Sequence, residues 1–88
     1  MAVTASEIEA ALRAGLTPVS IAVRDDSAAH AGHAGAGDGS HFSVQVTSAR
    51  FNGLSRVARH RLVYDALHQL IPRGIHALAI DARASGDS

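Results

Sequence analysis

The feature that most limits the fold of this chain is the stretch DDSAAHAGHAGAGDGSHF, residues 25–42. Ala, Gly, Ser and Asp make up most of it, and it carries His30, His33 and His41. Such a stretch has almost no apolar surface to bury, so it cannot contribute a packed core. We therefore predict a flexible Gly/His-rich loop over residues 25–40, and the core must come from the segments on either side of it.

Length and composition favour one small domain. The chain has 88 residues, which predicts a single domain over residues 1–88. It contains no Cys, and this excludes disulfides and any thiolate metal ligand from this chain. The N-terminal residues MAVTASEIEA have no basic start and no long apolar run, so neither a signal peptide nor a membrane span is predicted. We expect a soluble cytoplasmic protein with no membrane partner.

Two regular elements are predicted before the loop. Thr4 and Glu7 have the spacing of a capping box, and apolar residues follow at helical intervals. This pattern predicts a helix over about residues 4–14, which stops at Gly15. VSIAVR, residues 19–24, alternates apolar with small or polar side chains and predicts a strand with one buried face.

A second strand and a helical segment are predicted after the loop. HFSVQVTS, residues 41–48, alternates again, and we expect it to pair antiparallel with the first strand. Ser55 is a candidate N-cap for a helical stretch that runs to about residue 71, as one helix or as two. Pro72 and Gly74 are predicted to close this stretch.

The end of the chain completes the predicted architecture. IHALAI, residues 75–80, predicts the last strand, and the polar residues 83–88 are expected to form a disordered tail. The order of elements is then α-β-β-α-α-β, which predicts an α+β fold. Its three strands would form a mixed sheet with the helices packed on one face.

The histidines are the candidates for metal chemistry. His76 opens the last strand, so we place its imidazole on the rim of the sheet, where the mobile loop could bring His30 or His33 beside it. Two imidazoles without a thiolate leave an incomplete shell for structural zinc, and a pair of this kind is often incidental. We expect His41 to be a surface residue, and we assign no role to His68.

The arginines suggest a different function. Residues 50–73 contain five Arg and a single acid, Asp65, and this local excess of positive charge could face nucleic acid. The candidate contacts are Arg56, Arg59, His60 and Arg61. The ordinary alternative is a solvated helix face. The chain carries no net charge and few aromatic residues, which argues against a dedicated nucleic-acid binder.

No pattern in the sequence indicates an enzyme. There is no phosphate-binding or dinucleotide-binding glycine motif, and no Ser or acid is spaced with a His in a recognisable catalytic pattern. We therefore expect no catalytic residues and no small-molecule substrate.

The segment SHFSVQVTSARFNGLSRVARHRLVYDALHQLIPRGIHALAI strongly resembles the BolA family. The residues that carry the resemblance are the turn Phe51, Gly53 and Ser55, the signature Arg59, His60 and Arg61, the pair Val63 and Tyr64, and the run Ile75, His76, Ala77 and Leu78. The resemblance implies the fold α-β-β-α-α-β, similar to a type II KH domain.

The resemblance also implies a partner and a cofactor. Proteins of this family form heterodimers with monothiol glutaredoxins around a shared 2Fe–2S cluster, whose thiolates come from the glutaredoxin and its glutathione. The histidine at the start of the last strand, here His76, is one ligand, and a loop residue is the other. The family pattern acid-Ser-x-x-His fits Asp26 to His30, so His30 is the preferred loop ligand and His33 its rival. We expect no cluster in the isolated chain.

Two other functions stay open at this point. Some BolA-like proteins are linked to transcription and stress responses, so a regulator that binds DNA through the basic helical segment is the alternative function. The third possibility is an interaction module without a metal. The tail DARASGDS lacks the Thr-Pro and the terminal aromatic residue that many relatives carry.

Overall fold

The computed structural model describes residues 3–26 and 41–86. Its elements are α1 (Ala5–Leu16), β1 (Ser20–Asp25), β2 (His41–Ser48), the 3₁₀ helix η2 (Ala49–Phe51), α2 (Arg56–Ala66), α3 (Ile71–Gly74) and β3 (Ala77–Ala84). β2 lies at the centre of a three-stranded sheet, antiparallel to β1 and parallel to β3. The predicted α+β class, the antiparallel pair and the mixed sheet are confirmed. The likeness to a KH domain stays a prediction.

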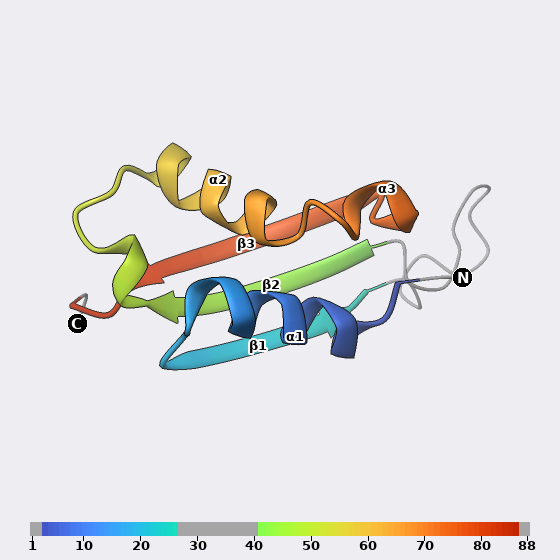
Figure 1. The fold of residues 1–88 in the computed structure, drawn as a ribbon, viewed down its shortest axis with the longest axis horizontal. Coiled ribbons are helices and arrows are strands. Elements are labelled where there is room, and N and C mark those ends of the chain that lie inside the picture. The colour runs from blue at the N-terminus through green and yellow to red at the C-terminus, as the bar shows by residue number, and fades with distance from the viewer. Residues whose placement is uncertain (1–2, 27–40, 87–88) are drawn as a thin grey trace.

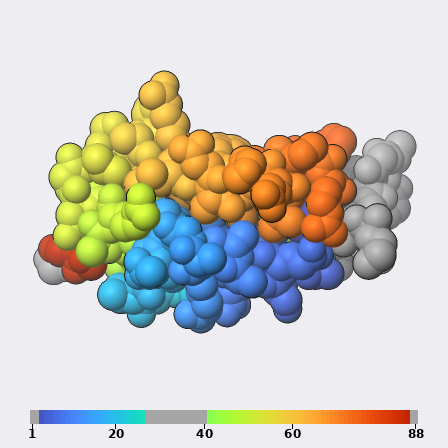
Figure 2. Space-filling model, in the orientation of Figure 1, coloured from blue at the N-terminus to red at the C-terminus, as the bar shows by residue number. Residues whose placement is uncertain are grey.

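The helices form a single layer on one face of the sheet (Figure 1). In the space-filling view of that side, α1, α2 and α3 hide most of the strands (Figure 2). Alternation along β2 explains the layer, because every second side chain of a strand points to the same face. The core formed in this way contains Phe42, Val44 and Val46 from β2, Ile8, Leu12 and Leu16 from α1, Val63 from α2, and Phe51 and Leu67.

Helix α1 begins as predicted and ends later than predicted. The Thr4 Oγ1 atom accepts from the Glu7 N–H at 3.1 Å, and the Thr4 N–H donates to the Glu7 carboxylate at 3.1 Å, which completes the capping box. Gly15 was predicted to stop the helix but lies within it, and Thr17 is the left-handed C-cap with φ +42°. A Cβ at position 15 would lie 3.0 Å from the Ala66 Cβ, so glycine allows α1 and α2 to pack closely.

The helical stretch after Ser55 is split in two. Ser55 is the N-cap of α2, as predicted, and its hydroxyl accepts from the Ala58 N–H. The prediction that Pro72 closes the stretch is wrong, because Pro72 lies in the first turn of α3. The first turn of a helix tolerates proline, since its N–H groups have no partner within the helix.

Strand β3 extends further than predicted. Ala84 is buried and pairs with Ser48 at the end of β2, and the Ser85 N–H donates to the Asn52 Oδ1 atom at 3.0 Å. The expected disordered tail over residues 83–88 is therefore wrong for residues 83–85, because residues 83 and 84 pair with β2 and Ser85 bonds to Asn52. Residues 87–88 lie outside the described part of the chain, as do residues 27–40 of the predicted loop.

None of the helices in residues 3–26 and 41–86 is long and apolar enough to cross a membrane.

Candidate metal centre

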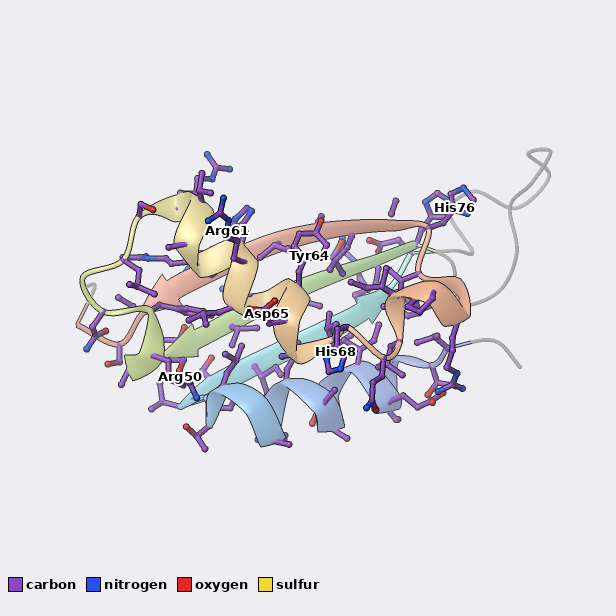
Figure 3. All side chains as sticks on the ribbon, turned by 45° about the horizontal axis from the view of Figure 1, so that its top comes forward. Arg50, Arg61, Tyr64, Asp65, His68 and His76 are labelled. Carbon is purple, nitrogen blue, oxygen red and sulfur yellow. The ribbon has the colours of Figure 1, made fainter. Side chains whose placement is uncertain are left out.

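His76 lies directly before β3, at the edge of the sheet where β2 and β3 begin. Its side chain is exposed, whereas Leu78 and Ile80 further along β3 are half-buried against the core. Gly74, with φ +147°, ends α3 two residues earlier and turns the chain into the strand. The predicted position of His76 on the rim of the sheet is thus what the structure has, and Figure 3 shows its ring at that end of the molecule.

A second imidazole lies beside His76. The ring centroids of His41 and His76 are 6.1 Å apart, and the ring planes differ by 23°. The parallel register explains this contact, because His41 at the start of β2 pairs with Ala77 at the start of β3. The prediction placed His41 only on the surface and missed the contact. The signal was available, since two parallel strands begin at the same edge of a sheet.

Asp26 holds the end of β1 at the same edge. Its N–H donates to the His41 carbonyl oxygen at 2.7 Å, and its carboxylate accepts from Arg24 Nε at 2.5 Å and from the Ser43 hydroxyl. His30 and His33 lie outside the described residues. The two described residues that flank their segment, Asp26 and His41, both lie at the edge that carries His76.

The donor chemistry of this edge suits a metal that is shared with a second molecule. Neutral imidazole nitrogen binds zinc and iron. The exposed His76 imidazole can fill one position of a tetrahedral ion, and the remaining positions would take donors from elsewhere. Within residues 3–26 and 41–86, no group of three or more His, Asp or Glu side chains is gathered closely enough to hold a metal ion.

The candidate nucleic-acid contacts on α2 lie away from this edge, near the second half of β3. Arg59 Nε donates to the Leu54 carbonyl oxygen at 3.0 Å, and Arg59 Nη1 donates to the Ala82 carbonyl oxygen at 3.3 Å. The guanidinium group therefore joins the start of α2 to β3, a structural role that was not predicted. Of the other candidate contacts, Arg56 and Arg61 are exposed.

His60 is half-buried and lines a pocket between α2 and β3. Arg56 and Asp81 line the same pocket. The Asp81 carboxylate is paired with Arg83 at 2.9 Å. This carboxylate, already paired with Arg83, offsets only part of the attraction that Arg56 and Arg59 in the same pocket exert on a phosphate group.

The fold and the edge histidines define the class: a small α+β domain with one exposed and one half-buried imidazole where its parallel strands begin. The family model described as BolA-like protein matches residues 12–87. The chain is 40% identical over 88 residues to "Protein BOLA1, chloroplastic" of Arabidopsis thaliana, covering 96% of this chain and 55% of that protein. The solved structure of BolA1 from Arabidopsis thaliana matches with a TM-score of 0.85 at 38% identity, covering 100% of this chain and 98% of that one. The chain belongs to the BolA-like family.

Two further relatives differ in their names. "SufE-like protein 1, chloroplastic/mitochondrial" of Arabidopsis thaliana is 44% identical over 78 residues, which are 82% of this chain and 21% of that protein. "DNA-binding transcriptional regulator BolA" of Escherichia coli is 41% identical over 73 residues, which are 83% of this chain and 68% of that protein. The names of the Arabidopsis relatives place those proteins in organelles, so the cytoplasmic location of this chain stays a prediction.

Proposed function

We propose that this chain is an adaptor that binds a monothiol glutaredoxin and helps to hold a 2Fe–2S cluster shared by the two proteins. The observation that carries the proposal is the exposed His76 ring at the sheet edge, with Asp26 and His41 at the same edge. A ligand to a shared cluster must be reachable from outside, and a ring at the open end of two strands meets this condition.

The ligands divide between the two proteins by their chemistry. This chain has no Cys, so the thiolates come from the glutaredoxin and its glutathione. His76 supplies one imidazole, and His30 supplies the other, with His33 as the alternative. The cluster is cargo rather than a resident cofactor. Imidazole competes with protons for the metal near neutral pH, so its attachment weakens as the pH falls, which suits a cluster that is handed on.

The relative with the SufE-like name supports the role of an adaptor. The matched part is 21% of that protein, so a domain similar to this chain forms one section of a longer polypeptide. In that relative the similar domain acts within a longer protein. We infer that the same kind of domain, as a separate chain, works together with a partner protein.

Visible absorption and circular dichroism test the proposal. Mixing the chain with a cluster-loaded monothiol glutaredoxin should change the spectrum of the cluster, and His76→Ala should abolish this change. His68→Ala is the matched control, because His68 is also exposed but contacts the Asp65 carbonyl oxygen in the turn after α2. An unchanged spectrum with the unsubstituted chain would overturn the proposal.

The same assay distinguishes the loop ligands. Relative to the complex of the unsubstituted chain, we expect His30→Ala to alter the cluster spectrum and His33→Ala to leave it unchanged. If only His33→Ala alters the spectrum, the assignment of His30 is wrong while the role of His76 stands.

A DNA-binding regulator is the second candidate function. It is favoured by the name of the Escherichia coli relative and by the exposed side chains of Arg56 and Arg61 on α2. Binding through these residues predicts a DNA affinity that falls with salt and falls further in Arg56→Gln and Arg61→Gln. An affinity that neither substitution lowers would exclude this surface.

A further inference from the structure

We propose that His41 is a positioning residue for His76, which holds the imidazole of His76 by stacking against it. This inference rests on the proposed function, since it assigns a purpose to the pair only if His76 binds the cluster. The ring centroids, 6.1 Å apart, lie within the range of aromatic pairs, and an interplanar angle of 23° makes the arrangement nearly parallel.

The two rings differ in how firmly the backbone holds them. His41 is the first residue of β2, where its carbonyl oxygen accepts from the Asp26 N–H and its backbone pairs with Ala77. Its side chain is half-buried. His76 lies between α3 and β3, outside both elements, and its side chain is exposed. The stacking contact therefore joins an exposed ring to a ring carried by the central strand.

Stacking leaves the ligating atoms of His76 available. A stacked contact uses the faces of the two rings, whereas imidazole binds a metal through a lone pair that lies in the plane of the ring. His41 can thus restrict the rotamers of His76 without competing for its nitrogen. A ligand whose rotamer is fixed before binding loses less side-chain entropy when it meets the metal.

The contact between His41 and His76 does not depend on the segment that carries the proposed loop ligand. His30 and His33 belong to a segment outside the described residues, whereas His41 and His76 are brought together by the parallel register of β2 and β3. The inference therefore concerns a third histidine of the same edge, with a role that depends on the shape of its ring and not on its nitrogen atoms.

Three substitutions test this role. His41→Ala removes the ring, and His41→Phe keeps a flat ring without a nitrogen donor. Gln45→Ala is the matched control, because Gln45 is exposed on the same strand but pairs with Ala22 and Asp81, away from His76. The first readout is the rate at which the complex with cluster-loaded glutaredoxin loses its visible spectrum. We expect about twofold to tenfold faster loss in His41→Ala, restoration in His41→Phe, and no change in Gln45→Ala.

The second readout needs no cluster. Three-bond couplings of the His76 side chain, measured by NMR on the free chain, report whether χ1 occupies one rotamer. We expect one dominant rotamer in the unsubstituted chain and in His41→Phe, and averaged couplings in His41→Ala. A rotamer distribution that is unchanged in His41→Ala would overturn the inference, as would a His41→Phe chain that loses its cluster as fast as His41→Ala.

The two proposals fail in different ways. If the His76→Ala chain still changes the cluster spectrum as the unsubstituted chain does, the proposed function fails, and the couplings still decide whether His41 orients His76. If His76→Ala abolishes the spectral change and His41→Ala alters neither readout, the proposed function stands and the positioning role of His41 is wrong.

Discussion

Substitution of Arg59 tests whether the most conspicuous basic residue of the chain serves the fold or a ligand. In the structure its guanidinium group donates to the Leu54 carbonyl oxygen at 3.0 Å and to the Ala82 carbonyl oxygen at 3.3 Å. Arg59→Gln shortens the side chain and removes the charge, so both carbonyl groups lose this donor. We expect the start of α2 to be held less firmly against β3.

The size of the effect follows from the geometry. Loss of a hydrogen bond that involves a charged group costs about 1.5–3 kcal/mol. Arg59 is half-buried and its bond to Ala82 is long, so water replaces part of what is lost. We expect the free energy of unfolding to fall by about 2 kcal/mol. In a domain of this size, a loss of 1 kcal/mol lowers Tm by about 4–8 °C, which gives a decrease of about 8–16 °C.

Urea denaturation followed by far-ultraviolet circular dichroism measures this change. Arg61→Gln is the control, because Arg61 lies on the same helix but is exposed. A surface substitution of that kind should change the free energy of unfolding by less than about 0.5 kcal/mol. If Arg59→Gln and Arg61→Gln unfold at the same urea concentration, the guanidinium group of Arg59 does not hold α2 to β3 and the reasoning is refuted.

Two further predictions concern α1. Gly15→Ala should destabilise the fold by about 1 kcal/mol, because overpacking at 3.0 Å from the Ala66 Cβ outweighs the gain in helix propensity. A double-mutant cycle with Ala66→Gly should show coupling, and strictly additive effects would contradict the close contact. The hydrogen bond from Arg73, followed by that from the Thr4 backbone, lowers the pKa of Glu7 below its ordinary value of 4.5. Because the folded-state pKa is the lower one, this contribution to stability is present above pH 4.5 and is lost as the pH falls through the folded-state pKa, so Glu7→Gln should lower Tm at pH 7 and leave it unchanged in strong acid.

Local sequence patterns correctly predicted the helices and strands whose bounds are set by residues close together in the sequence. The alternation over residues 41–48 matches β2 at both ends, and the capping box at Thr4 and Glu7 marks the start of α1. Each signal involves residues only a few positions apart. Hydrophobic period and capping chemistry therefore suffice to locate these elements.

The boundaries that were predicted wrongly depend on packing between distant segments. Gly15 resembles a helix terminator in sequence, but in the structure it is the point where α1 meets Ala66 of α2. The polar residues 83–88 resemble a tail, yet β2 pairs with Arg83 and Ala84. In the sequence, a glycine needed for close helix packing looks the same as one that ends a helix. A strand that its partner extends likewise looks the same as a frayed terminus.

The candidate site divides in the same way. His76 could be placed on the rim from its position in the last strand alone. His41 meets His76 through the parallel register of β2 and β3, a signal that was available but not used. Arg59 could not be assigned, because it meets Ala82 only when α2 packs on β3.

The parallel pairing of β2 and β3 also separates the two candidate functions in space. His76 stands where β3 begins, while Arg59 contacts Ala82 near its end, and a strand advances by about 3.3 Å per residue. The six residue steps from position 76 to position 82 place the histidine edge and the contact of Arg59 about 20 Å apart along the strand. Figure 3 shows Arg61 of α2 and His76 well separated along the molecule. A partner that shares a cluster at the edge therefore need not cover Arg56 or Arg61. The two candidate activities would compete only if the partner extends along β3, because the His76 ring and the arginines of α2 lie on separate parts of the surface.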